Sequence, residues 1–313
     1  MSGLRKRTRS MRRRLMGDVI WIVTRIINGL SDSVTRRLAS FLGQSMYIFS
    51  VTDRKRILDN LERIFGTTQP EQSRKKLARS VCIHLAQAAI EAIRLQSKEP
   101  NEIRSTADDA GFETAAKESF QRGRSIMIIT AHYGNWELFA ARVALIGPLT
   151  VLARKNPNPK IERLIQDIRD RNRVRVIDRS DPAAPREMIR MGHEGGHILG
   201  ILMDQDTTRI QGIFSPFMGI PALTPSGPAS IAIRGLYDVY VGMLRPLPDG
   251  HHVFDLDGPL PIPNIADRSE GIQRLTDLFN AALSEKILRA PEYWVWNHRR
   301  WRRRPPTESM EGI

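Results

Sequence analysis

The chain is poor in cysteine and in long hydrophobic runs, and each shortage excludes a class of protein. Cys82 is the single cysteine among 313 residues, which excludes an intramolecular disulfide framework and suits a reducing compartment. The best apolar stretch, Leu15 to Leu30, is interrupted by Asp18 and Arg25 and falls short of the about 20 residues of a standard transmembrane helix. Asp18 and the lack of an A-x-A cleavage site also argue against a signal peptide.

Acidic residues are scarce relative to basic ones, 34 against 48, and the formal net charge is +14. Two terminal clusters hold most of the excess, so the body of the chain is close to neutral. The clusters are Arg5, Lys6, Arg7, Arg9, Arg12, Arg13 and Arg14, and Arg299, Arg300, Arg302, Arg303 and Arg304. Such charge predicts an anionic partner. A phosphate-bearing membrane surface fits it, whereas zinc-finger spacing, an RNA-binding aromatic signature and a basic heptad are lacking, so no nucleic acid is expected.

The stretch from Leu15 to Leu30 carries its apolar residues at helical spacing. A basic arm that leads into an amphipathic helix is typical of an interfacial membrane anchor. The alternative is that this stripe packs on the protein's own core, and the preceding charge favours the membrane.

The chain has two regions that differ in the spacing of their apolar residues. Residues 1–100 form a predicted helical N-terminal region with the basic arm and the membrane-anchoring amphipathic helix, and residues 101–313 a predicted α/β domain. Expected helices of the first region are Asp53 to Phe65 and Glu71 to Leu95, separated by a Gly-Thr-Thr-Gln-Pro breaker. In the second, expected strands are 125–130, 149–153, 174–177, 197–203, 239–244 and 252–256, with helices over 136–145, 160–172 and 185–191. This alternation predicts a mostly parallel central sheet flanked by helices.

Polar segments directly follow three of these strands, where the chemistry of open parallel sheets usually lies. They begin at His132, Arg154 and Asp204. His132 and Glu137 are five residues apart, so on one continuous helix they would point about 140° apart. They can meet only if His132 lies in the strand-to-helix turn. An imidazole tuned by a carboxylate is a standard general base, and no nucleophile elbow is present, which favours direct attack by an acceptor hydroxyl. The alternative is that His132 is a turn or capping residue.

Three ordered motifs resemble one known family. The segment AHYGNWE around His132 resembles the H-x4-D/E motif of glycerolipid acyltransferases, and in particular the lauroyl and myristoyl acyltransferases of lipid A biosynthesis. Asp204-Gln205 followed by residues 212–219 is similar to that family's DQ and G-x-F-x-x-F-F-G stretch. Residues 291–301 resemble its P-E-x-W-x-W-x-H-R-R-W terminus. Met218 replaces the usual aromatic residue, which puts the acyl chain length in doubt.

This resemblance implies a glycerolipid acyltransferase-like α/β fold and acyl transfer from a thioester to a hydroxyl of a lipid A precursor. His132 would be the general base and Glu137 would orient its ring. Arg154, Asp204, Gln205 and Asn135 are the implied substrate-binding residues, although a surface charge for Arg154 and a structural hydrogen bond for Asp204 are competing interpretations. The donor would be acyl carrier protein or coenzyme A, the acceptor a phosphorylated glycolipid, and the place the cytoplasmic face of an inner membrane. No cofactor or metal is implied.

Alternative functions stay open from the sequence. The acceptor could be another glycolipid or an aminolipid, or the chain could be a non-catalytic basic protein that binds anionic lipid or nucleic acid. His193 to His197 matches the H-E-x-x-H zinc motif. That motif needs a helix, and Gly195-Gly196 is a poor helix interior, so we interpret the segment as a helix-to-strand turn.

Overall fold

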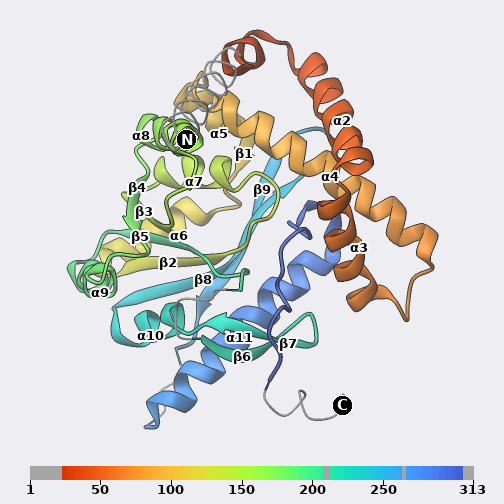
Figure 1. The fold of residues 1–313 in the computed structure, drawn as a ribbon. Helices are drawn as coiled ribbons and strands as arrows, with labels where there is room; N and C mark the ends of the chain where they lie inside the picture. The colour runs from red at the N-terminus through yellow and green to blue at the C-terminus, as the bar shows by residue number, and fades with distance from the viewer. Residues whose placement is uncertain (1–22, 207–211, 263–265, 306–313) are drawn as a thin grey trace, which may run out of the picture.

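A computed structural model describes residues 23–206, 212–262 and 266–305, and Figure 1 shows its fold. The helices are α2 (Asp32–Phe49), α3 (Val51–Phe65), α4 (Glu71–Arg94), α5 (Pro100–Thr106), α6 (Phe112–Gln121), α7 (Trp136–Ala144), α8 (Pro159–Arg171), α9 (Ala184–Glu194), α10 (Gly227–Arg234), α11 (Arg268–Arg289) and the 3₁₀ turn η1 (Pro291–Tyr293). The strands are β1 (Ala107–Asp108), β2 (Ser125–Thr130), β3 (Leu149–Ala153), β4 (Arg175–Asp178), β5 (Ile198–Leu202), β6 (Gly212–Phe217), β7 (Ile220–Pro225), β8 (Tyr237–Pro246) and β9 (His252–Leu260).

A seven-stranded sheet in the order β1-β9-β8-β2-β5-β3-β4 forms the centre of the molecule. Every neighbouring pair in it is parallel except β8 and β9, which pair antiparallel. The predicted mostly parallel sheet flanked by helices is therefore confirmed. Because β2 pairs with β5 on one side and with β8 on the other, the carboxyl ends of β2 and β5 lie next to each other.

Side chains of β2 alternate between two hydrophobic cores. Ile126 and Ile128 pack with residues of α6, α7 and α8, whereas Met127 and Ile129 pack with residues of α9 and α11. Successive side chains of a strand point to opposite faces, so a strand covered on both faces must be apolar throughout. This explains why the run SIMIIT reads as one unbroken apolar segment.

The helices α2, α3 and α4 lie together at one side of the sheet, at the right of Figure 1. Ile57 and Leu61 of α3 and Val81 of α4 are fully buried in the same core cluster as Met127 and Ile129 of the sheet. The prediction that the chain is mainly helical up to about residue 100 is confirmed from residue 23 onward. The basic arm and the first half of the expected amphipathic helix lie outside the described residues, and residues 23–29 are helical.

Among the described residues, no helix is long and apolar enough to cross a bilayer. Several large apolar side chains of α2 and of its junction with α3 are nevertheless exposed. They are Val34, Phe41, Leu42, Ile48, Phe49 and Val51.

The segment after η1 packs against the turn that follows β2 and against β6 and β7. The alternation of Trp294 and Trp296 in the sequence predicts that both pack in the core on a final strand, with the neighbouring arginines exposed. Both tryptophans are fully buried, but they follow a 3₁₀ turn and not a strand, and Trp294 forms only an isolated bridge to Tyr133. The expectation that all the nearby arginines are exposed was wrong for Arg300. Its guanidinium is buried, donates to Leu223 O and Thr224 Oγ1 at 2.7 Å each, and stacks over the Phe217 ring at 4.6 Å. Burial lowers the pKa of Arg300 to about 10.

The H-E-x-x-H segment forms the predicted helix-to-strand turn. The helix α9 ends at Glu194 and β5 begins at Ile198, with Gly195 and Gly196 between them at φ +72° and +73°. These left-handed conformations favour glycine, and they take the two histidines off a common helical face.

Candidate active site

His132 lies in a tight turn between β2 and α7. Gly134 in this turn has a φ of +52°, and a Cβ there would come within 3.2 Å of the Pro246 ring. Asn135 is the N-cap of α7, and its Oδ1 accepts from Leu138 N at 2.9 Å. Such a cap satisfies one of the free N–H groups at a helix start. The turn residues thus place His132 at the carboxyl end of β2, before the helix begins.

Asp204 binds His132 through both the ring and the backbone. The ring nitrogen Nδ1 lies 2.8 Å from Asp204 Oδ1, and the His132 backbone N–H donates to Oδ2 at 3.1 Å. Trp294 Nε1 also donates to Oδ2, at 2.8 Å. A carboxylate accepts only, so the proton of a neutral ring sits on Nδ1 and the Nε2 lone pair is free to take a proton.

The Asp204 carboxylate is fully buried and kept ionised. Burial by itself would raise the pKa of Asp204, but the charge of His132 and the hydrogen bonds from His132 and Trp294 outweigh it and lower the pKa to about 2. A carboxylate against Nδ1 stabilises the imidazolium that forms when Nε2 takes a proton. This geometry is that of an oriented general base.

Three further side chains surround the imidazole. The Gln205 amide nitrogen lies 2.9 Å from Nδ1 and 3.2 Å from Nε2, so it sits across the ring and not end-on to either nitrogen. Trp136 packs edge-on with its ring centroid 5.1 Å from that of His132. The His298 ring lies 6.1 Å away, and burial lowers the pKa of His298, which favours its neutral form.

Glu137 forms an ion pair with Arg169 of α8. The guanidinium donates from Nε to Oε2 at 3.1 Å and from its terminal nitrogen to Oε1 at 2.6 Å. Both side chains are largely buried, 12% and 14% exposed. In the described part of the chain, no hydrogen bond joins Glu137 to His132. The carboxylate that binds the His132 ring is that of Asp204, and not that of Glu137 as expected.

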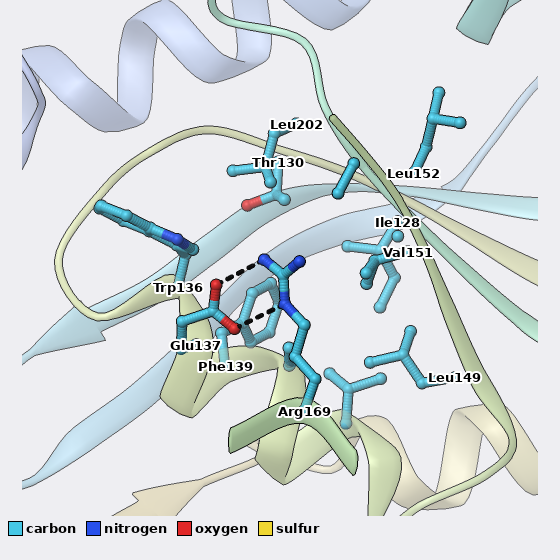
Figure 2. A pocket seen from close by; sticks show the side chains of 14 residues that line it. Ile128, Thr130, Trp136, Glu137, Phe139, Leu149, Val151, Leu152, Arg169 and Leu202 are labelled. Atoms are coloured by element: carbon cyan, nitrogen blue, oxygen red, sulfur yellow. Dashed lines mark hydrogen bonds and ion pairs between the residues drawn. The ribbon is translucent and has the colours of Figure 1, made fainter. Parts of the chain in front are cut away.

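The Glu137–Arg169 pair stands at one end of a narrow slot between the sheet and the helices α7 and α8. Figure 2 shows the pair and Trp136 at one end, with Leu149, Val151 and Ile128 toward the other. Apart from Thr130, Glu137 and Arg169, the lining side chains are apolar. The lining is polar at one end and apolar beyond, which is the order of an acyl chain attached to a polar carbonyl group. The slot has a volume of about 40 Å³, so its lining side chains must move apart to admit such a chain.

The other predicted substrate-binding residues are placed differently. Asn135 is buried, and besides capping α7 it donates to Glu91 Oε2 at 3.3 Å. Arg154 is exposed at the end of β3, and its charge helps to lower the pKa of the half-buried Arg179 after burial itself. The structure therefore brings together His132, Asp204 and Gln205, and no hydrogen bond joins Arg154 to them among the described residues.

Sequence reasoning missed Arg169 and His298. Arg169 belongs to a charged helix, Lys160 to Asn172 in the prediction, where an arginine looks like part of a solvated face. His298 stands within the C-terminal motif, which was a signal for it, but the sequence does not show that this segment returns to His132.

A histidine held by a buried carboxylate at the carboxyl end of a parallel strand is an arrangement with which an α/β enzyme can activate a hydroxyl for group transfer. A comparison with protein families identifies the family to which the chain belongs. The chain belongs to the bacterial lipid A biosynthesis acyltransferases, whose family model matches residues 5–303. The family resemblance of the sequence motifs is thereby confirmed, and the protein is an acyltransferase.

Individual relatives are distant but cover most of the chain. The lipid A biosynthesis lauroyltransferase of Escherichia coli is 24% identical over 288 residues, which is 92% of this chain and 90% of the relative. The palmitoleoyltransferase of the same organism is 23% identical over 253 residues, 80% and 79% of the two chains. A lipid A biosynthesis acyltransferase of Haemophilus influenzae is 23% identical over 299 residues, 94% and 91%.

Proposed function

We propose that the protein transfers a fatty acyl chain from an acyl thioester, on acyl carrier protein or coenzyme A, to a hydroxyl of a lipid A precursor. The single observation that carries this proposal is the His132–Asp204 pair next to the apolar slot. The pair supplies a base for the hydroxyl, and the slot suits the chain of the donor. The names of the relatives, which act in lipid A biosynthesis, support the choice of acceptor.

The proposed reaction proceeds by direct attack. His132 Nε2 takes the proton of the acceptor hydroxyl while its oxygen adds to the thioester carbonyl carbon. The resulting tetrahedral intermediate collapses, the carbon–sulfur bond breaks, and the imidazolium returns the proton to the leaving thiolate. Asp204 holds the ring through Nδ1 and stabilises its charged form.

Glu137 supports this site in the proposal through Arg169. The bidentate ion pair holds the first turn of α7 against α8 at the polar end of the slot, where the thioester carbonyl would lie. Gln205 and Arg154, which are accessible, are the proposed substrate contacts. Asp204 and Asn135 are buried and act through His132 and through the start of α7.

We place the reaction at the cytoplasmic face of the inner membrane. The exposed apolar side chains of α2 support this placement, because Phe41, Ile48 and Phe49 are 67%, 57% and 79% exposed. Large apolar side chains clustered at a surface mark interaction sites, and a bilayer interface accepts such a face.

The experiment is acyl transfer by the detergent-solubilised protein from an acyl carrier protein thioester to a tetra-acylated lipid A precursor, read as product mass. We expect one added acyl chain with the wild type and a loss of at least about a hundredfold in His132→Ala. Transfer that survives this substitution would remove the mechanism, and transfer to another glycolipid alone would remove the lipid A acceptor.

A further inference from the structure

A second hollow lies between α3 and the C-terminal segment, and the ring of His298 in its lining is 6.1 Å from that of His132. This basic groove has a volume of about 550 Å³. One wall is the face of α3 that carries Lys55, Asp59 and Arg63, and the opposite wall is residues 298–302. Asn60 ties the walls together, because its Nδ2 donates to Trp296 O at 2.8 Å and to His298 O at 2.7 Å.

The charge of the groove is unbalanced. Its lining has five cations, Lys55, Arg56, Arg63, Arg299 and Arg302, and one carboxylate, Asp59. Arg302 pairs with Asp206 at 3.0 Å, and Arg56 lies 3.9 Å from Asp53. Within the described residues, Lys55, Arg63 and Arg299 have no carboxylate partner. Unpaired guanidinium and ammonium groups that converge on a concave surface match a phosphate group, which accepts several charge-assisted hydrogen bonds.

One edge of the groove is apolar. Val51 lines it and is 61% exposed, and it adjoins Phe49 at the junction of α2 and α3. A free phosphate or nucleotide would gain nothing from such an edge. A ligand that carries phosphate on one part and acyl chains on another uses both, since its chains can remain along the apolar corner or in the bilayer.

The groove and the slot each have a lining residue whose ring lies near the imidazole of His132. His298 lines the groove and its ring lies 6.1 Å from that of His132, whereas Trp136 lines the slot with its ring at 5.1 Å. Because the slot suits the acyl donor, the groove is left for the molecule that brings the hydroxyl.

We propose that the basic groove between α3 and residues 298–302 binds a phosphate group of the acceptor lipid and so positions its hydroxyl at His132. This assignment rests on the proposed acyl transfer. Lys55, Arg63 and Arg299 contact the phosphate, and the apolar corner at Phe49 and Val51 receives the acyl chains of the acceptor.

The test compares two acceptors and two proteins. The acceptors are a phosphorylated lipid A precursor and the same lipid after phosphatase treatment. The variant is Arg63→Gln/Arg299→Gln. The matched control is Arg186→Gln, an exposed arginine of α9, which lies at the left of Figure 1, whereas α3 lies at the right. Thermal unfolding of each protein shows whether it is folded.

For the phosphorylated acceptor, we expect the double variant to raise KM and lower kcat/KM by about tenfold or more, because two charge-assisted contacts are lost. For the dephosphorylated acceptor, the variant and the wild type should be equal. KM for the acyl thioester should not change, and the control should match the wild type. The variant Arg63→Lys/Arg299→Lys, which keeps the charge, should recover part of the loss.

Equal losses with both acceptors, or no loss, would overturn the proposal. A rise in KM for the thioester alone would assign the groove to the phosphate of the donor instead. If the wild type transfers no acyl chain, the proposed reaction fails, and equilibrium binding of the phosphorylated lipid decides separately on the groove. Weaker binding by the double variant than by Arg186→Gln would then support it, and equal binding would overturn it.

Discussion

The slot lined by Trp136 and the groove lined by His298 both lie near the His132 imidazole but have opposite chemistry. In the slot, the one strong charge pair, Glu137–Arg169, is internally neutralised, and the rest of the lining is apolar. In the groove, Lys55, Arg63 and Arg299 lack carboxylate partners within the described residues. A region that neutralises its own charges suits an uncharged chain, whereas a region with surplus charge needs an anion from outside.

Asp204 lines neither of these two regions. Its oxygens are taken by His132 and Trp294, and it is fully buried. In the proposed function, this difference separates the residues that contact substrate from Asp204, which acts through His132. The following predictions test that separation, beginning with the largest effect.

Asp204→Asn should lower kcat by at least about a hundredfold, because the neutral amide no longer stabilises the imidazolium and can turn the ring to the wrong tautomer. KM for both substrates should stay within about twofold, since Asp204 touches neither. Initial rates at varied donor and acceptor concentrations give both parameters. A rise in the acceptor KM with kcat unchanged would make Asp204 a substrate-binding residue.

Glu137→Gln should destabilise the protein by about 2 kcal/mol, because Arg169 is left largely buried with a neutral partner; the cost is below that of a fully buried pair since both side chains are slightly exposed. Urea unfolding measures it. The control is Glu187→Gln, whose ion pair with Arg175 is more exposed and should contribute less than about 1 kcal/mol. Equal effects of the two substitutions would mean that burial of the Glu137 pair has no energetic consequence.

Ala140→Leu should narrow the slot and change which donors react. Ala140 lines the slot from α7, and leucine is nearly as good a helix former as alanine. We expect kcat/KM for a dodecanoyl donor to fall about tenfold, with an octanoyl donor nearly unaffected. Competition between the two donors, read by product mass, gives the ratio directly. An equal loss with both donors would show that the chain does not enter this slot.

Added salt should weaken binding of the acceptor phosphate in the groove and leave binding of the acyl chain in the slot unchanged. Raising the ionic strength from about 0.05 M to about 0.3 M should lower kcat/KM for a phosphorylated acceptor about threefold, because exposed charges are screened. The dephosphorylated acceptor is the control and should show no such change. A salt effect of the same size with both acceptors would place the screened interaction elsewhere.

The fold was largely predictable because its strands are covered on both faces. Strands such as β2 and β3 must then be continuous apolar runs, and the sequence places both with their observed bounds. The hairpin of β6 and β7 and the helix α11 were not predicted. In β6, Gly212, Ser215 and Pro216 interrupt the apolar pattern, and Asn280 of α11, fully buried, is kept in the core by bonds to Ser215 and Thr224 that only the tertiary structure supplies.

The sequence indicated where the residues of the site lie, but not which of them contact each other. The rule that polar residues gather beyond the carboxyl ends of parallel strands selected His132 and Asp204, and the structure brings these two side chains into contact. Their contact depends on β2 and β5 being neighbours, which residues 72 positions apart do not reveal. Glu137, nearer in sequence, was the natural expectation for the partner, and only the position of α8 shows that Arg169 binds it. The groove could not be predicted from the sequence for a similar reason. Its cations come from α3 and from the C-terminal segment, which are far apart in the sequence.

The most direct test of the account is a cycle of His132→Ala, Asp204→Asn and the double variant, with kcat measured for each. If Asp204 works by holding and charging the His132 ring, its substitution has nothing further to remove once the ring is gone. We therefore predict that the double variant is as slow as His132→Ala alone. A double variant slower than His132→Ala by the full factor of Asp204→Asn would contradict the claim that the two residues form one catalytic unit.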